Sequence, residues 1–293
     1  MRFNEIGEQL RAFRLESGLR AEEIAARIGV SRAALYRYEK GDVIKLDTVK
    51  RLAELLKISP LALLGVGIEY YSRAAGFLER LRQIEETADQ VLQVEGPVCY
   101  LTTSEEYDAA LREAFDALAE RGAPAAPREP LRAAAEQVLA ILTLRKRTYA
   151  QRRPSIIALL SASAIRQFLA EGIARTLELP ERLRRRCREV AATEIARIIS
   201  LMEAEPIGVQ FGLLTGAVPT GAFIIFRGRE RTTLALNPFR LDTHPSEQSG
   251  VAMITAADEP VAAHQRAAEV LWQDAVKGAA AIATLKEMVA AAH

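Results

Sequence analysis

Residues 19–41 read LRAEEIAARIGVSRAALYRYEKG, and this stretch decides the fold of the N-terminal region. Its apolar residues recur at helical spacing until Gly29, which suits the left-handed backbone conformation that ends a helix. Ser31 is suited to cap the next helix, because its hydroxyl accepts a hydrogen bond from a backbone N–H one turn ahead. The small Ala25 lets two helices approach, and Leu35 pins the second helix against the first. The stretch therefore predicts two short helices joined by a tight turn.

Apolar residues at helical spacing continue on both sides of this stretch, and Gly18 and Gly41 interrupt them. The pattern predicts five short helices between residues 5 and 64. Together with the Gly-Val-Ser turn, this frame resembles the XRE, or lambda-repressor-like, family of helix-turn-helix domains. In one departure from that family, Arg20 stands near the position where a Gln often clamps a phosphate. The resemblance implies that residues 1–65 form a domain that binds double-stranded DNA.

In that family the second helix of the motif lies in the major groove with its N-terminal residues at the base edges. An Arg there can donate two hydrogen bonds to guanine, and an Ala can contact a thymine methyl group. The resemblance implies that the exposed residues of this helix contact bases, and that basic residues flanking the motif contact phosphates. The first group is Ser31, Arg32, Ala33, Ala34, Tyr36 and Arg37, and the second is Arg20, Lys40 and Lys45.

The charge of the chain is nearly balanced, with 39 Lys and Arg against 38 Asp and Glu. This balance excludes a generic polycation as the DNA-binding device. Residues 1–65 alone hold 12 basic against 9 acidic residues, so the excess lies on the predicted DNA-binding domain. A single domain with few phosphate contacts binds weakly, and high affinity comes from two half-sites about one helical turn apart. We therefore expect a homodimer.

Apolar residues between Tyr70 and Val91 are spaced alternately by four and three, which is a heptad seam over three repeats. The spacing predicts one long helix over residues 68–94, within a linker that spans residues 66–95. Two interpretations stay open, because this helix can pack on its own domain or form part of a dimer interface. The candidate dimerisation residues are Tyr70, Phe77, Leu81, Ile84 and Val91.

Beyond residue 96 the patterns of strand and helix alternate, which predicts an α/β domain with a mixed sheet over residues 96–293. The fold class of the whole chain is thus a five-helix domain, a long linker helix and an α/β domain. Strands are predicted at residues 98–101, 155–160, 207–214, 222–227, 232–236 and 250–255. Helices are predicted at residues 104–120, 131–148, 162–171, 180–202 and 260–292.

The sequences LALNPF at 234–239 and SGVAMIT at 249–255 resemble the closing strands of phospholipase-D-like domains. Active members of that family carry an HxK motif whose His is the nucleophile. This chain lacks HxK, and the nearest approach, His264-Gln-Arg, lies within the predicted final helix. Cys99 and Cys187 lie far apart with no neighbouring His, so no metal site is indicated. We therefore expect no enzymatic activity and no cofactor, and the natural use of the domain is to sense a ligand.

Polar residues follow two predicted strands at the start of the next helix, where ligands bind most often in such sheets. Thr102, Thr103 and Ser104 follow the first strand, and Ser161 and Ser163 follow the second. Their hydroxyls and the helix N–H groups would suit a carboxylate or a phosphate. Plain helix capping explains the same residues, and both readings stay open. The candidate effector is a small, anionic molecule.

The combined pattern predicts a cytoplasmic, homodimeric, sequence-specific transcription regulator whose C-terminal domain binds an effector. No window approaches the ~20 apolar residues that a membrane span needs, so we expect no membrane contact. One alternative is a phosphodiesterase-type enzyme tethered to DNA by its N-terminal domain. Another is an antitoxin-like protein that represses its own operon while it holds a partner protein.

Overall fold

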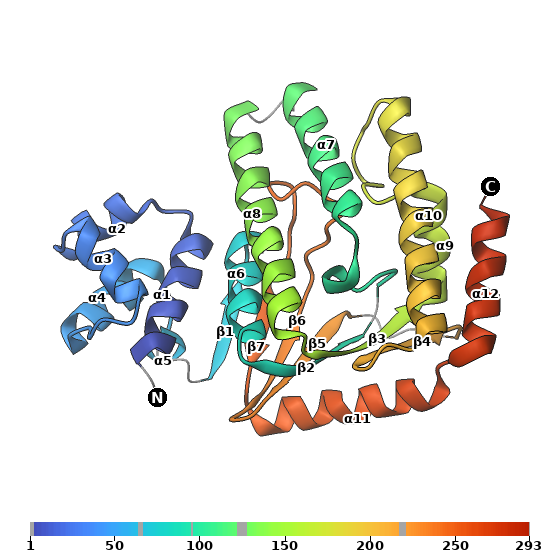
Figure 1. Ribbon diagram of the computed structural model, residues 1–293. Helices are drawn as coiled ribbons and strands as arrows, with labels where there is room; N and C mark the ends of the chain where they lie inside the picture. Colours follow the sequence, from blue (N-terminus) through green and yellow to red (C-terminus); the bar gives the residue numbers. More distant parts are fainter. Residues whose placement is uncertain (1–2, 64–66, 95, 122–127, 217–220, 293) are drawn as a thin grey trace.

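The chain folds into a small helical part at the N-terminus and a larger part built on one sheet (Figure 1). This arrangement confirms the expected class of a helical domain followed by an α/β domain. The computed structural model describes residues 3–63, 67–94, 96–121, 128–216 and 221–292.

The N-terminal part contains the five predicted helices, whose largest apolar side chains meet in one buried core. Gly29 ends the second helix with φ at 72°, and Ser31 Oγ accepts a hydrogen bond from the Ala34 N–H at 3.1 Å. Leu35 is fully buried beneath them, so the turn and the cap form as the sequence predicts. The helices are α1 (Phe3–Ser17), α2 (Ala21–Ile28), α3 (Arg32–Glu39), α4 (Leu46–Leu56) and α5 (Pro60–Leu63).

The larger part is built on a mixed sheet, which within the described residues has seven strands in the order β1-β7-β6-β5-β2-β3-β4. β2, β3 and β4 run parallel to one another, and the remaining neighbours pair antiparallel. The strands are β1 (Ile68–Tyr71), β2 (Ala88–Val94), β3 (Ser155–Ser161), β4 (Val209–Leu214), β5 (Phe223–Gly228), β6 (Thr232–Leu236) and β7 (Ala252–Thr255). The predicted strands from residue 155 onward are therefore confirmed.

Helices cover the two faces of this sheet, with α7, α8 and α10 on one side and α11 along the other (Figure 1). The predicted final helix is two helices, because Val276 leaves the helical path and pairs with Leu213 of β4. None of the helices in the described ranges is long and apolar enough to cross a membrane. The helices are α6 (Ala74–Glu85), α7 (Glu105–Arg121), α8 (Arg128–Arg152), α9 (Ala162–Glu171), α10 (Glu181–Ala204), α11 (Asp258–Asp274) and α12 (Gly278–Ala291).

The long linker helix predicted over residues 68–94 does not form. The segment is instead the strand β1, the helix α6 and the strand β2, and all three belong to the larger part. A bulge in β2 between Ala88 and Gln90 breaks the alternation of its side chains. Ala88 and Val91, three residues apart, are consequently buried in the same core, and this spacing imitates a helix in the sequence. Val94 is buried in a second core, with Leu159 and Ile225.

The predicted dimer seam is also corrected, because most of its residues are buried in the core of their own chain. Tyr70 alone is exposed, at 56%, on β1. A side chain buried in its own core cannot present a surface to a second copy. The buried members are Phe77, Leu81, Ile84 and Val91. The predicted domain boundary at residues 65–66 lies outside the described residues.

The strand predicted at residues 98–101 is a short 3-10 helix, η1 (Tyr100–Thr102). The hydroxyl of Thr102 donates to the Cys99 carbonyl at 2.9 Å, and that of Thr103 donates to the Tyr100 carbonyl at 2.8 Å. These bonds close a turn, and a short apolar run alone does not distinguish a buried turn from a buried strand.

Candidate DNA-binding surface and ligand cavity

The helix α3 presents the residues that the resemblance assigns to base contacts. Its inner face is fixed by the buried Leu35, so the other positions turn outward. The exposed members are Ser31, Arg32, Ala33 and Arg37, and the half-buried members are Ala34 and Tyr36.

Both arginines of α3 hold exposed carboxylates in the DNA-free chain. Arg32 Nη1 lies 2.7 Å from Glu22 Oε1, and its guanidinium lies 5.3 Å from the centre of the Tyr36 ring. Arg37 Nε lies 3.6 Å from Asp42 Oδ2. Exposed pairs contribute little to stability, so each guanidinium can exchange its carboxylate for another partner at low cost.

The three predicted phosphate contacts are exposed around the motif. Arg20 stands at the N-cap of α2, where its backbone N–H donates to Glu23 Oε2 at 2.8 Å and its side chain is 79% exposed. Lys40 caps the C-terminus of α3, and Lys45 is the N-cap of α4. All three side chains are thus placed next to helix ends of the motif and are open to solvent.

The helix α1 holds the C-terminal end of α3 from inside the molecule. Arg14 Nε donates to Glu39 Oε1 at 2.5 Å, and Arg14 Nη2 donates to Glu39 Oε2 at 3.1 Å. A Cβ on Gly7 would lie 2.4 Å from the Tyr38 carbonyl oxygen, so only glycine permits this approach of the two helices. α1 therefore fixes the C-terminal end of α3.

The other side of α1 packs against α6 and β1 of the larger part, and we call this contact the α1–α6 junction. At its centre the buried Glu69 carboxylate accepts from Gln9 Nε2 at 2.7 Å and from Tyr71 OH at 2.7 Å. Arg80 supplies a two-pronged ion pair, with Nε at 2.9 Å and Nη2 at 3.1 Å from the two oxygens. The Arg80 and Glu69 side chains are only 4% and 7% exposed.

Further contacts at the junction fix the start of α6. The Glu16 carboxylate of α1 accepts from the backbone N–H groups of Ser72 and Arg73, at 2.6 and 2.9 Å. A Cβ on Gly76 would lie 2.8 Å from Glu16 Cβ and 3.0 Å from its backbone N, so the two helices touch at this glycine. α1 thus ties α3 on one side to α6 on the other.

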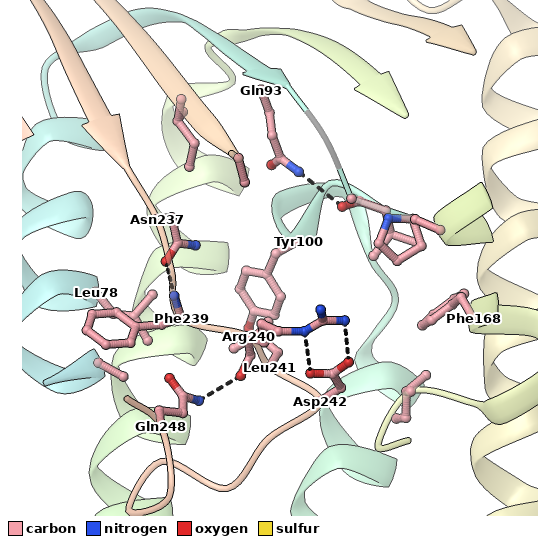
Figure 2. A pocket seen from close by; sticks show the side chains of 18 of the residues that line it. Leu78, Gln93, Tyr100, Phe168, Asn237, Phe239, Arg240, Leu241, Asp242 and Gln248 are labelled. Carbon is pink, nitrogen blue, oxygen red and sulfur yellow. Dashed lines mark hydrogen bonds and ion pairs between the residues drawn. The ribbon is translucent and has the colours of Figure 1, made fainter. Parts of the chain in front are cut away.

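A cavity of about 580 Å³ opens at the carboxyl ends of the parallel strands β2 and β3 (Figure 2). Val94 and Ser161 line it at these strand ends, and Leu78 and Leu81 line it from α6. The segment that follows β6, residues 237–248, forms another wall. Ligands of mixed sheets bind outside the carboxyl ends of parallel strands, and the size falls within the ~300–1,000 Å³ of small-molecule sites.

The predicted ligand residues divide into two groups at this cavity. Ser161 and Ser163 line it, while Thr102, Thr103 and Ser104 are not part of its wall. Ser104 donates its backbone N–H to Glu194 Oε1 at 3.1 Å and its hydroxyl to the same carboxylate. The hydroxyls of these three residues therefore serve the fold: those of Thr102 and Thr103 close the η1 turn, and that of Ser104 caps α7 by accepting from the Tyr107 N–H at 3.2 Å.

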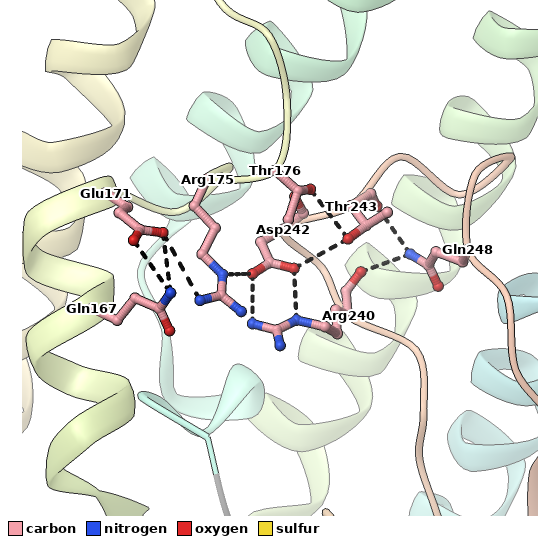
Figure 3. Close-up of polar contacts among 8 residues, drawn as sticks. All are labelled: Gln167, Glu171, Arg175, Thr176, Arg240, Asp242, Thr243 and Gln248. Carbon is pink, nitrogen blue, oxygen red and sulfur yellow. Dashed lines mark hydrogen bonds and ion pairs between the residues drawn. The ribbon is translucent and has the colours of Figure 1, made fainter.

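Sequence reasoning missed the charged residues at the mouth of the cavity, which come from segments distant in the chain (Figure 3). Asp242 Oδ1 and Oδ2 accept from Arg240 Nε at 3.0 Å and Nη2 at 2.8 Å. Arg175, which follows α9, also donates its Nε to Asp242. No spacing in the sequence links Arg175 to a residue 67 positions away.

Deeper in the cavity, Arg145 of α8 pairs with the buried Glu85 at the end of α6, with Nη2 to Oε1 at 2.6 Å. Its guanidinium lies 5.5 Å from the centre of the Tyr100 ring. Burial raises the pKa of the Tyr100 and Tyr107 hydroxyls, so both remain protonated donors at neutral pH.

His264 lies within α11, as the sequence predicts, and its Nδ1 lies 2.8 Å from the Pro260 carbonyl oxygen. Its ring meets Phe223 edge-on at 5.0 Å. The described residues contain no group of three or more His, Cys, Asp or Glu that could hold a metal ion.

Comparison with solved structures gives a distant match and no transferable function. The structure of TrmBL2, described as an archaeal chromatin protein with a novel mode of DNA binding, aligns at 10% identity with a TM-score of 0.34. The alignment covers 78% of this chain and 60% of that chain, so this chain spans less than two thirds of TrmBL2. A search of curated protein sequences finds no significant match.

Comparison with protein families gives a local match. Residues 5–64, which contain α2, the Gly29 turn and α3, match the family described as "Helix-turn-helix domain". The match covers the five-helix part and does not extend into the larger part of the chain. The N-terminal part of this protein is therefore a helix-turn-helix domain.

Proposed function

We propose that this protein is a cytoplasmic, sequence-specific regulator of transcription that binds DNA through an XRE-type helix-turn-helix domain. The observation that carries the proposal is the exposure of Arg32 and Arg37 on α3, within a domain that matches helix-turn-helix proteins. In such domains this helix enters the major groove, and an Arg there donates two hydrogen bonds to guanine. Arg20, Lys40 and Lys45 would fix the domain on the phosphates.

The second part of the proposal is control by an effector in the cavity. The support is that α6 lies between the cavity and α1: Leu78 and Leu81 line the cavity, while Gly76 and Gln83 contact α1. A ligand that favours one position of α6 would therefore favour one position of α1 and of α3. It can act only if it binds one arrangement more tightly than the other.

The third part is a homodimer, which we propose because two helix-turn-helix domains on two half-sites give the affinity that one lacks. The segment from Tyr70 to Val91 does not supply the interface, since most of its apolar side chains are buried within the chain. Light scattering of the full chain, with and without an operator fragment, measures the oligomeric state. A protein that stays monomeric with and without the operator fragment, and binds one half-site, would contradict the proposed homodimer.

The proposal includes no catalytic step. A phospholipase-D-like enzyme needs an exposed His of an HxK motif, whereas His264 belongs to HQR within α11 and holds its Nδ1 near the Pro260 carbonyl. The resemblance to phospholipase-D-like domains is thus proposed for the fold of the larger part alone.

The test of DNA reading is Arg37→Ala in a gel-shift titration with the upstream region of the protein's own gene. We expect the variant to lose about 1–3 kcal/mol of binding free energy, or roughly 5- to 150-fold in affinity, because a bidentate base contact disappears. Titrations are compared at one stated salt concentration, since phosphate contacts make affinity strongly salt-dependent.

The matched control is Arg132→Ala, which removes an exposed arginine of α8 in the larger part of the chain. This variant is expected to bind DNA as the parent does. If Arg37→Ala binds the operator as tightly and as selectively as the parent, α3 is not the reading helix.

A further inference from the structure

We infer that the cavity binds an amphipathic anion, a molecule with an apolar body and one carboxylate-type headgroup held by Arg240 and Arg175. The inference deepens the proposed function, and its regulatory consequence rests on that function. Binding of the anion by itself does not depend on DNA and can be measured alone.

The first support is the charge of the cavity wall. Among the described residues that line the cavity, Arg145, Arg175 and Arg240 are cationic and Asp242 alone is anionic. Arg145 is balanced by Glu85, and Arg175 Nη1 lies 3.9 Å from Glu171, but neither of these carboxylates lines the cavity. At the mouth, a ligand therefore meets two guanidinium groups around one carboxylate, while Glu171 lies farther away and outside the cavity wall.

The second support is the arrangement of donors at the mouth. Two guanidinium groups share the single carboxylate of Asp242, and each guanidinium has five N–H donors. The contacts with Asp242 use Nε and Nη2 of Arg240, whose side chain is 57% exposed. A second carboxylate can therefore bind beside Asp242 through donors that Asp242 does not occupy, in the planar geometry that arginine and carboxylate share.

The third support is the apolar body of the cavity. Phe239 and Phe168 lie on opposite sides of the Arg240–Asp242 pair (Figure 2). Leu78 and Phe115 add apolar wall from α6 and α7. A ligand that places its headgroup on Arg240 would therefore bury an apolar chain or ring against these side chains.

A route from the headgroup to the DNA-binding domain is also present. Arg240 follows Phe239, whose ring packs edge-on against Phe77 of α6 at 5.8 Å. Gln248 Nε2 donates to the Arg240 carbonyl at 2.6 Å, which ties the two ends of this segment together. An anion that repositions Arg240 thus acts directly on a segment that contacts α6, and α6 contacts α1.

The experiment is isothermal titration of the full chain with two anions, decanoate and 2-naphthoate, each below its aggregation threshold. Decan-1-ol and 2-naphthylmethanol are the neutral counterparts, and decyltrimethylammonium is the cationic one. We expect one site per chain for at least one anion. Its neutral counterpart is expected to bind at least tenfold more weakly, and the cation more weakly again.

Two variants locate the headgroup. Arg240→Ala is expected to weaken the bound anion at least tenfold and to leave the neutral counterpart unchanged, since it removes the guanidinium alone. Asp242→Asn is expected to tighten the anion, because it removes the competing carboxylate. The matched control is Arg166→Ala, an exposed arginine of α9 that does not line the cavity and is expected to have no effect.

The inference is overturned if neither anion binds, if an anion and its neutral counterpart bind equally, or if Arg240→Ala leaves the anion unaffected. A parallel gel shift separates this result from the proposed function. If the anion binds and the affinity for DNA is unchanged, the anion site is supported and only its proposed effect on DNA binding is contradicted. Anion binding by a chain that fails to bind DNA supports the site and contradicts the proposed function.

Discussion

The ion pairs on the outer face of α3 and those of the α1–α6 junction use the same residue types in opposite environments. Arg37 of α3 and Asp42, which follows that helix, are 69% and 55% exposed, and their charged atoms lie 3.6 Å apart. At the junction, Arg80 and Glu69 are 4% and 7% exposed, and Arg80 contacts both carboxylate oxygens within 3.1 Å. The difference indicates that the first pair is free to change partners and the second is fixed.

This contrast matches what each region must do under the proposed function. An arginine that reads bases must release its carboxylate when DNA arrives, so an exposed and weak pair suits it. A junction that transmits a displacement of α6 must keep α1 and α6 fixed relative to each other. Its buried carboxylate, with donors from Gln9, Tyr71 and Arg80, allows only one arrangement of α1 on α6.

The largest expected change in stability comes from Arg80→Met, which leaves the Glu69 carboxylate buried without its cationic partner. Removal of one partner of a buried pair costs about 3–5 kcal/mol, because the remaining charge is uncompensated. We expect a loss of this size in the free energy of unfolding, measured by urea denaturation of the full chain. The double variant Glu69→Gln/Arg80→Met, which buries no charge, should regain part of the loss. A loss below about 1 kcal/mol for the single variant would show that the junction is not fixed by this pair.

The helix-turn-helix domain was predictable because its determinants are local. Gly29 ends α2, Ser31 caps α3 three residues from its partner N–H, and Leu35 sits one turn further. Each of these features acts within one or two helical turns. A short stretch of sequence therefore contains all the residues on which the prediction depends. The later strands, from residue 155 onward, were predictable for the same reason, since buried runs bounded by turns mark them.

The junction and the mouth of the cavity were not predictable, because their partners are distant in sequence. Glu69 and Gln9 are separated by 60 residues, and Arg175 and Asp242 by 67. Pattern reasoning also failed at β2, where a bulge gave buried residues the spacing of a helix. The bulge thus prolonged the helical spacing of α6 into a strand in the middle of the sheet, and the two elements resembled one linker helix.

A smaller effect is expected from Gly76→Ala, which tests whether the junction is as tight as its geometry indicates. The new Cβ would lie within about 3.0 Å of Glu16 Cβ and backbone atoms, so α1 and α6 must separate. Overpacking costs about 1–3 kcal/mol, and the better helix propensity of Ala returns up to about 1 kcal/mol. We expect a net loss of unfolding free energy in thermal denaturation. Gly216→Ala, where nothing lies within 4 Å of the added atom, is the control and should be near neutral. Equal stability of both variants would contradict a close-packed junction.

The smallest effect is expected from Asp42→Asn, which frees Arg37 without altering its side chain. The substitution removes a weak exposed pair and one negative charge beside the proposed reading residue. Affinity for the operator should therefore rise by about two- to fivefold, while the free energy of unfolding stays within about 0.5 kcal/mol of the parent. Gel shift and denaturation measure the two quantities, and Glu54→Gln, an exposed acid of α4, controls for net charge. A marked loss of unfolding free energy would contradict this prediction. It would show that the Arg37–Asp42 pair stabilises the fold, as the buried pairs of the α1–α6 junction do.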